Sequence, residues 1–411
     1  MRGVWQLVRI ALRNVVRNRR RSAITLVALG MAVCVLVFLR GAVNGLQAVL
    51  KERVIYGQTG VVQIHKRGFI ANVKKSPLHF GCPAGPAMLA KVRAVEGVQA
   101  VTPRVAFATM VSVKDTTLFA LGLGIDPVLE YDVCPQRRND LSPGSTVSGG
   151  AADGLGVTTP ELRDQLALKR GDELTLLAPD FDGTLNGGLV GVGGFLADNP
   201  AFSADKKLIF VPLAAAQALV RLDEQATELA VRSADPDAAD ALKQRLEAAL
   251  GPGFEVHTWR ELAKFAVDAL STQEKALGFV TGIFALVALF GILNTMLMIV
   301  LARTKEIGTM MAVGVRRRSI LGLVVSEAAI LGGLGAILGG ALGVCAVLLA
   351  AKVGLSIKPP GATLPDIVRP FVSLAFVARA VIGAMIGAAI AAVYPAYRAS
   401  RMTPIEALGA L

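Results

Sequence analysis

The chain of 411 residues is 53% hydrophobic and has a mean hydropathy of +0.56. A soluble protein of this length is seldom so apolar, so the composition argues against an ordinary soluble enzyme and predicts membrane spans. The net charge of +12 would by itself fit a nucleic-acid-binding protein. Residues 46–272, however, carry 23 Lys and Arg against 26 Asp and Glu, whereas the remainder carries 20 against 5. A basic excess confined to apolar segments and their flanks is typical of a membrane protein and needs no nucleic-acid partner.

The N-terminal segment places basic residues before the first apolar run. Residues 4–13 predict a short amphipathic helix, with Trp5 and Leu12 on one face, that suits the inner surface of a membrane. We interpret the apolar run 23–39 as the first span, with the N-terminus in the cytosol. A cleavable signal peptide is the alternative, but the long basic region and the poor cleavage site before Cys34 argue against it.

The segment after the first apolar run has the character of a soluble domain. Its two ends have helical spacing and predict that the flanking membrane helices continue outward as a stalk. Strands are expected at residues 61–65, 101–113, 174–177, 208–211, 228–232 and 254–258, and helices at residues 160–168, 213–221 and 236–250. This alternation predicts a mixed α+β domain with its own core. The Ser-, Gly- and Pro-rich segment 139–156 predicts a flexible surface loop.

Three further apolar runs predict membrane spans, at residues 276–302, 320–351 and 371–394. Small residues recur every fourth position in the last two runs, as Gly335, Gly339, Gly343 and as Gly383, Gly387, Ala391. Such rows let helices approach closely in lipid, so we expect helix packing that includes a dimer seam, although Gly is also common in membrane helices generally. Arg379 either faces a partner, the bundle interior or water, or marks where the last span begins.

The predicted fold is therefore an α-helical membrane protein with four transmembrane helices and a mixed α+β extracytoplasmic domain between helices one and two. The segments are a cytosolic amphipathic helix (1–22), transmembrane helix one (23–45), the outer domain with its stalk (46–272), transmembrane helix two (273–302), a short cytosolic helix (303–318), transmembrane helix three (319–351), an outer loop (352–370), transmembrane helix four (371–394) and a cytosolic tail (395–411).

A short charged segment, residues 303–318, joins the second and third spans. Ile307, Met310, Met311 and Gly314 fall at i, i+3, i+4 and i+7 and so share one face of a predicted helix. An apolar face on a helix outside the membrane suggests a partner in the cytosol. An ordinary basic cytosolic loop is the other interpretation.

This segment and its surroundings resemble the signature of the FtsX/MacB/LolC-type ABC transporter permeases. The matching residues are Asn294, Thr295, Arg303, Glu306, Ile307, Gly308, Ala312, Gly314, Ile320 and Glu327. The C-terminal end also fits the family pattern, through Pro395, Ala396, Ala399, Pro404, Glu406, Ala407 and Leu408. The outer domain resembles the family less specifically. The family often has a basic residue where this chain has Met310 or Met311, so the resemblance predicts a more apolar contact with the ATPase.

The resemblance implies a function and a set of partners. Residues Arg303, Glu306, Ile307, Gly308, Met310, Met311 and Gly314 would form a coupling helix that docks on an ABC ATPase. The chain would be a permease in the bacterial inner membrane, with both termini cytosolic, a periplasmic domain and a second copy or paralogue as dimer partner. It would export or extract a lipophilic substrate, a lipoprotein, a peptide or a drug. The alternative is an FtsX-like signalling scaffold that activates an extracytoplasmic partner without transport.

The ATPase itself is expected on another chain. No G-x-x-x-x-G-K-[ST] phosphate-binding loop occurs in the 411 residues. ATP and magnesium would then be bound by the partner, with no cofactor on this chain. Membrane lipids and a periplasmic or outer-membrane protein are the other expected partners.

One motif suggests an enzyme. Asp180 and Asp182 follow an apolar strand in the sequence DFDGT, which resembles the nucleophile loop of haloacid-dehalogenase-type phosphatases. There the first Asp attacks phosphorus and the second acts as acid and base beside magnesium. Residues 203–259 contain no convincing Asp pair to complete such a site, so we expect no catalytic residue.

The histidines and cysteines predict little chemistry. His65, His79 and His257 are too scattered in the sequence for us to propose a metal site. Cys82 and Cys134 lie in the outer domain and either form a disulfide in an oxidising compartment or remain two free thiols.

Overall fold

The computed structural model describes residues 13, 19–72, 77–197, 207–357 and 366–401. The chain divides into two compact units, a helical unit of Met1–Gln47, Leu270–Ser356 and Ile367–Leu411 and an outer unit of Ala48–Ala269 and Ile357–Asp366. The N-terminal amphipathic helix predicted at residues 4–13 lies outside the described residues apart from Arg13, as does the end of the family pattern from Pro404 onward.

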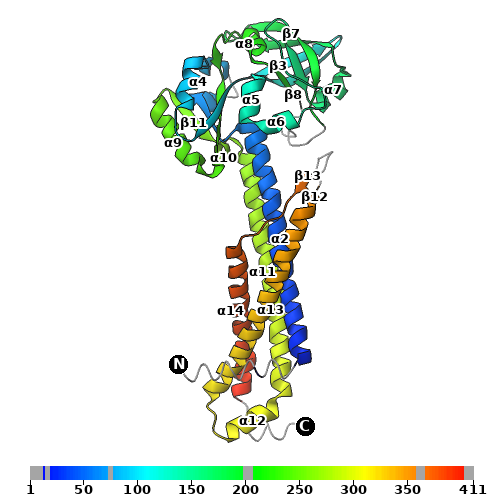
Figure 1. Ribbon diagram of the computed structural model, residues 1–411, viewed down its shortest axis with the longest axis vertical. Coiled ribbons are helices and arrows are strands. Elements are labelled where there is room, and N and C mark those ends of the chain that lie inside the picture. Colours follow the sequence, from blue (N-terminus) through cyan, green and yellow to red (C-terminus); the bar gives the residue numbers. More distant parts are fainter. Residues whose placement is uncertain (1–12, 14–18, 73–76, 198–206, 358–365, 402–411) are drawn as a thin grey trace. The chain divides into compact units, whose positions relative to one another are not determined.

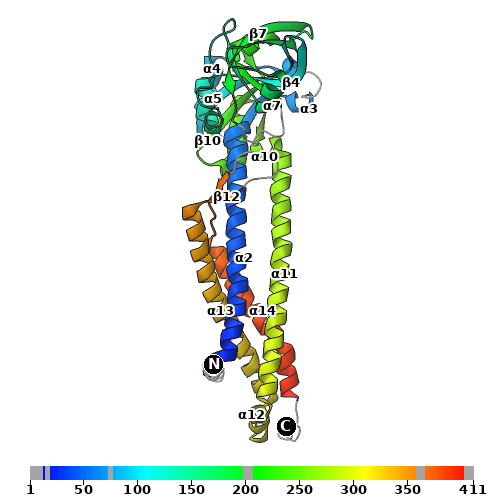
Figure 2. The same ribbon diagram turned by 90° about the vertical axis from the view of Figure 1, so that its right-hand side faces the viewer.

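Four long apolar helices dominate the helical unit. They are α2 (Arg19–Val54), α11 (Lys264–Ala302), α13 (Arg317–Val353) and α14 (Leu374–Ser400). Each is long and apolar enough to cross a bilayer, which needs about 20 residues. Their membrane portions lie side by side in both views (Figures 1 and 2), and the short helix α12 (Thr304–Ala312) joins α11 to α13. The predicted fold class of four spans is thereby confirmed.

The outer unit is built on a nine-stranded mixed sheet. Its strand order is β11-β1-β10-β3-β4-β8-β5-β7-β6, and β6 also pairs with β3, so the last six strands close into a ring. The strands are β1 (Val62–Lys66), β3 (Val98–Val113), β4 (Thr116–Ile125), β5 (Leu155–Thr158), β6 (Glu173–Pro179), β7 (Leu185–Phe195), β8 (Leu208–Pro212), β10 (Glu228–Ser233) and β11 (Phe254–Thr258). All six predicted strands are confirmed. The 16-residue β3 pairs with β10 through its first half and with β6 through its second, and so belongs to both parts of the sheet.

Short elements connect these strands. The helices and turns are η1 (Ile55–Thr59), α3 (Phe69–Asn72), η2 (Pro77–Phe80), α4 (Pro86–Arg93), α5 (Pro127–Val133), α6 (Pro135–Asn139), α7 (Pro160–Leu166), α8 (Leu213–Val220), η4 (Pro236–Ala238), α9 (Ala239–Leu250) and α10 (Trp259–Leu262). Two-stranded pairs form between β2 (Cys82–Pro83) and β9 (Gln225–Ala226) and between β12 (Leu355–Ile357) and β13 (Asp366–Val368). The three predicted helices are present.

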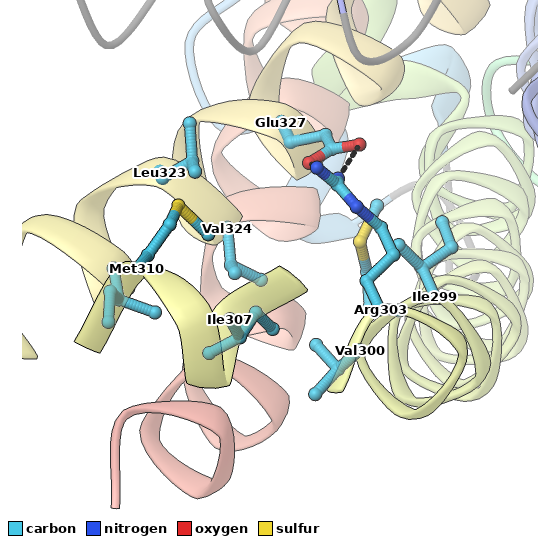
Figure 3. Close-up of a pocket in the computed structure, with 10 residues that line it drawn as sticks. Ile299, Val300, Arg303, Ile307, Met310, Leu323, Val324 and Glu327 are labelled. Carbon is cyan, nitrogen blue, oxygen red and sulfur yellow. Dashed lines mark hydrogen bonds and ion pairs between the residues drawn. The ribbon is translucent and has the colours of Figure 1, made fainter. Parts of the chain in front are cut away.

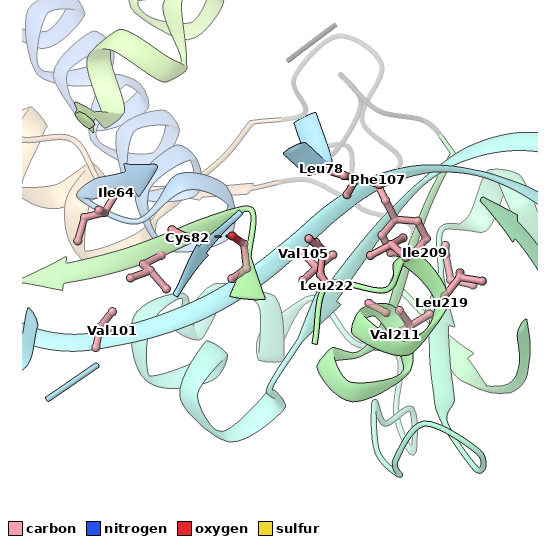
Figure 4. Packing of buried hydrophobic residues seen from close by; sticks show 14 of the residues in the cluster. Ile64, Leu78, Cys82, Val101, Val105, Phe107, Ile209, Val211, Leu219 and Leu222 are labelled. Atoms are coloured by element: carbon pink, nitrogen blue, oxygen red, sulfur yellow. Dashed lines mark hydrogen bonds between the residues drawn. The ribbon is translucent and has the colours of Figure 1, made fainter. Parts of the chain in front are cut away.

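The core of the outer unit follows the alternation predicted for the longest strand. Val105, Phe107 and Val111 point from one face of β3 and are buried. They pack with residues from β8 and α8 such as Ile209 and Leu219 (Figure 4). The prediction of a flexible surface loop at residues 139–156 is partly wrong, because Val147 is 3% exposed and packs into a second apolar cluster.

Candidate coupling site

The corner between α11 and α13 is shaped by a helix-ending motif. After α12, the Val315 N–H donates to the Met310 carbonyl and the Gly314 N–H donates to the Met311 carbonyl, both at 3.0 Å. These two hydrogen bonds together form a Schellman motif, which needs a residue in the left-handed conformation just past the end of the helix. Gly314 occupies that position with φ +91° and has no atom within 4 Å of where a Cβ would lie. Gly314 is therefore required by backbone conformation rather than by close packing.

The apolar face of α12 packs on the chain's own helices. Ile307 is 5% exposed and Gly308 is buried. Around Ile307 lie Val300 of α11 and Val324 of α13 (Figure 3). Met310 and Met311 pack against the same cluster and are half-buried. Ile307 and Gly308 are thus covered within the chain, whereas Met310 and Met311 are half-buried and Gly314 is exposed, so contact of this face with a cytosolic partner stays a prediction.

An ion-pair network ties α12 to α13. Arg303 donates from Nε to Glu306 at 2.8 Å and from Nη1 to Glu327 at 3.2 Å. The Arg303 and Glu327 side chains are 15% and 5% exposed, whereas Glu306 is 47% exposed. Figure 3 shows the Arg303–Glu327 pair beside a small apolar cavity of about 20 Å³. Three residues of the sequence signature thus meet at one point, although 24 positions separate Arg303 from Glu327.

The surface left for a partner differs from the predicted stripe. Lys305, Glu306 and Thr309 are exposed on the outer side of α12. Val313 is 81% exposed and Val315 39% exposed in the turn that follows. The two valines were not predicted from the sequence, because they fall off the helical stripe. An apolar residue directly beside the glycine that ends a helix was the signal available to find them.

Two family models match the chain. The MacB-like periplasmic core domain matches residues 22–249, more than half of the chain, and the FtsX-like permease C-terminal model matches residues 278–404. The chain belongs to the FtsX-like ABC transporter permeases. The α12 corner of this permease lies within the residues that the FtsX-like model matches. With four helices long enough to span a membrane and a MacB-like periplasmic core domain, the permease is a multi-pass membrane protein with a periplasmic domain.

Curated relatives match the permease over part of their length. The macrolide export ATP-binding/permease protein MacB of Nitrobacter winogradskyi is 30% identical over 209 residues, 50% of this chain and 30% of that protein. The pyoverdine export ATP-binding/permease protein PvdT of Pseudomonas putida is 34% identical over 234 residues, 53% and 33% respectively. The permease therefore spans about a third of the length of these relatives. The periplasmic region of MacB from Actinobacillus actinomycetemcomitans overlaps with a TM-score of 0.36 at 13% identity, over 52% of this chain and 94% of that one.

The two glycine rows of the permease have different surroundings. Gly335, Gly339 and Gly343 of α13 pack on α2, where Gly339 lies directly against the backbone of Gly30. The close helix packing expected of this row is present, against a helix of the same chain, and the dimer seam stays a prediction. In α14, a Cβ placed on Gly387 would lie 3.1 Å from Leu289 Cδ2, whereas a Cβ placed on Gly383 would have no atom within 4 Å.

Cys82 and Cys134 are free thiols in separate surroundings. The Cys82 thiol donates to the Ala226 carbonyl across the β2–β9 pair, at 3.3 Å (Figure 4). The Cys134 thiol lies 3.1 Å from Arg104 Nη2 at the start of α6. The disulfide alternative is therefore wrong in this structure. Burial raises the pKa of Cys82 to about 12 and also raises the pKa of Cys134, so both thiols are expected to be unreactive.

Two histidines that are distant in the sequence meet in the fold. Pairing of β1 with β11 places the rings of His65 and His257 5.7 Å apart, although 192 positions separate the two residues in the sequence. His65 is buried, which lowers its pKa, and it stacks on Phe69. Among the described residues, no cluster of three or more His, Cys, Asp or Glu suits a metal ion.

The phosphatase-like motif forms a hairpin turn between β6 and β7. Asp180 Oδ1 accepts hydrogen bonds from the N–H groups of Asp182 at 3.0 Å and Thr184 at 2.9 Å. Its Oδ2 lies 3.3 Å from Arg221. An Asp that bonds to N–H groups two and four residues on is typical of a turn. The Asp180 carboxylate therefore has a structural role here.

A buried charge cluster in the outer unit was missed from the sequence. Arg104 is 1% exposed and donates two hydrogen bonds to Glu130, at 2.8 and 2.9 Å. Arg104 also donates to the Gln58 carbonyl group, and Arg137 donates to those of Gly57 and Gln58, in the turn that continues α2. Such carbonyl groups at a helix end lack intrahelical partners, and cations stabilise them. A charged residue inside the apolar strand VTPRVAF was the signal available.

Proposed function

We propose that this permease couples ATP hydrolysis on a separate ABC ATPase to movement of its periplasmic domain, and so exports or extracts a lipophilic substrate, a lipoprotein, a peptide or a drug. The supporting observation is the α12 corner. Ile307 of its apolar face packs against α11, α13 and α14, while Lys305, Glu306, Thr309 and Val313 remain exposed. A short helix that packs on these three helices and keeps an exposed outer surface is suited to bind an ATPase and to transmit its movement to the membrane helices.

The Arg303–Glu327 ion pair would transmit a displacement of α12 to α13. Glu327 lies one-third of the way along α13 and is nearly buried, so a displacement of α12 that keeps the pair intact must also move α13. The ATPase contact is therefore assigned to the exposed residues of α12 and its following turn, and the role of Ile307 and Gly308 to holding α12 in place.

The first test is purification of the tagged chain from its native membrane in mild detergent, with mass spectrometry of the proteins that accompany it. We expect an ABC ATPase in stoichiometric amount, and a second permease would indicate a heterodimer. Val313→Glu is expected to remove most of the ATPase while the thermal unfolding midpoint stays unchanged. Val353→Glu is the matched control, because Val353 is 86% exposed at the opposite end of α13.

Two results would contradict the proposal. One is the reproducible absence of any ATPase from the wild-type preparation. The other is an equal loss of ATPase from both Val→Glu variants, which would indicate a general effect of charge rather than a contact at the α12 corner. Substrate movement in sealed vesicles, compared with activation of an extracytoplasmic hydrolase, separates transport from signalling.

A further inference from the structure

A large apolar groove lies within the helical unit, among α2, α11 and α14. Its volume is about 610 Å³, within the range of about 300–1,000 Å³ typical of ligand sites. Its walls include Leu29 and Leu36 of α2, Phe284 and Ile292 of α11, and Gly383 and Gly387 of α14. Gly383 has no atom within 4 Å of a Cβ position, so this wall is open. Apolar walls of this extent give water few hydrogen-bonding partners.

The groove is about one leaflet deep. On α2 it extends from Leu29 to Arg40, on α11 from Thr281 to Ile292 and on α14 from Phe376 to Gly387. Each stretch covers eleven residue steps, or about 16 Å of helix, which is close to half of a hydrocarbon core of about 30 Å. Because the chain crosses the membrane alternately, Arg40, Thr281 and Arg379 all lie toward the end of the spans that leads into the periplasmic domain.

The two arginines at this end of the groove differ in their pairing. Arg40 is paired with Glu274 at 2.8 Å and lies over the Phe376 ring, 5.7 Å from its centroid. Arg379 is exposed, and the hydrogen bond described for it runs from Nε to the Ala375 carbonyl of its own helix, at 3.3 Å. The outer ends of its guanidinium are thus free to bind an anion beside the groove.

A second copy of this chain has no carboxylate to offer Arg379 from its own spans. In residues 19–47, 270–356 and 367–401, the acidic residues are Glu274, Glu306 and Glu327. Each of the three is ion-paired within its own chain. Lipid phosphate is the anion that is abundant at this depth, and Arg binds phosphate in a planar, two-pronged geometry.

We propose that the groove binds an acyl chain of an anionic phospholipid from the periplasmic leaflet, with the lipid phosphate on Arg379. The apolar walls bind the acyl chain without selecting the headgroup. Arg379 supplies the preference for a net negative headgroup such as that of phosphatidylglycerol. The site is independent of the α12 corner and requires only that the four helices span a membrane.

The test uses the full chain, purified in detergent and depleted of lipid. Phosphatidylglycerol or phosphatidylcholine is titrated in mixed micelles, and bound lipid is counted by native mass spectrometry. We expect phosphatidylglycerol to bind more tightly, and Arg379→Gln to weaken its binding about tenfold. The binding of phosphatidylcholine should fall less, because the choline cation offsets the charge of its phosphate. Arg379→Lys should retain part of the preference. Lys352→Gln is the control, because Lys352 is an exposed base on the same membrane side that does not line the groove.

A second variant tests the groove itself. Gly383→Leu fills the open wall and should reduce the binding of both lipids, with an unfolding midpoint in lipid-free detergent equal to that of the wild type. Equal affinity for the two lipids, or unchanged phosphatidylglycerol binding in Arg379→Gln, would overturn the proposal. Efficient crosslinking of two chains through Gly383→Cys would overturn it as well, by showing that a second copy fills the groove.

Discussion

Arg303 precedes α12 and Glu327 lies in α13 after it, and their side chains meet at 3.2 Å in a largely buried corner. The pair connects the residue between α11 and α12 to the third turn of α13. Because Ile307 packs into the same corner, polar and apolar contacts hold α12 together. The corner is therefore held by several contacts at once, as the proposed coupling role requires.

Removal of one member of this pair should be costly. Glu327→Met leaves the Arg303 charge without its nearly buried partner and should destabilise the chain by about 3 kcal/mol. Arg303→Met should have a similar effect, and the double variant should cost less than the sum of the two. Thermal unfolding in detergent measures all three, with the exposed Lys305→Met as control. Strictly additive losses would show that the two side chains do not interact.

The two glycine rows predict opposite responses to the same substitution. Gly339→Ala places a methyl group against the Gly30 backbone and should destabilise the α2–α13 contact by about 1–3 kcal/mol. Gly383→Ala meets open space and should leave the unfolding midpoint unchanged or slightly raised, because Ala favours helix. Both are measured in the same detergent. A midpoint that falls equally in the two variants would contradict the packing described here.

The buried cluster around Glu130 predicts a pH dependence. Burial opposes the charged form, but Arg104 and Arg137 outweigh it and hold the pKa of Glu130 below its ordinary value of 4.5. A carboxyl group with a lowered folded-state pKa stabilises the fold above its unfolded pKa and loses that contribution as the pH falls toward the folded value. We therefore expect the midpoint of outer-domain unfolding, followed by Trp259 fluorescence, to fall as the pH drops below about 4.5.

Glu130→Gln tests the same cluster at neutral pH. It removes the buried carboxylate that Arg104 and Arg137 share, leaves Glu228 as the other carboxylate on Arg104, and should cost about 3 kcal/mol. It should also flatten the acid dependence. The matched control is Glu173→Gln, at an exposed carboxylate at the start of β6. An acid dependence identical to that of the wild type in Glu130→Gln would show that other groups cause it.

The thiols give a direct chemical check. Alkylation in denaturant without a reductant should modify all four cysteines, because the structure has free thiols at each. A Cys82–Cys134 disulfide would leave those two unmodified until a reductant is added. In the folded protein, Cys82 and Cys134 should resist alkylation, since burial raises the pKa of both. Rapid labelling of either in the folded state would contradict their described burial.

Local patterns were enough to predict the four spans, the outer domain and most of its strands. A span is set by the length of its own apolar run, and a half-buried strand such as β3 shows its inner face by alternation. Gly314 was selected from the sequence as a coupling residue, which stays a prediction, and its structural role is local as well, because a Schellman motif needs a residue with positive φ there.

The tertiary structure decided which faces are covered and which side chains meet. Periodicity shows that Ile307 and Met310 share a face of α12. It does not show that Val300 and Val324 pack around Ile307. Likewise the partners of Arg303, Arg104 and Gly339 come from segments far away in the chain. Composition and spacing fix what a segment needs to bury, whereas the choice among several chemically suitable partners depends on how the whole chain packs.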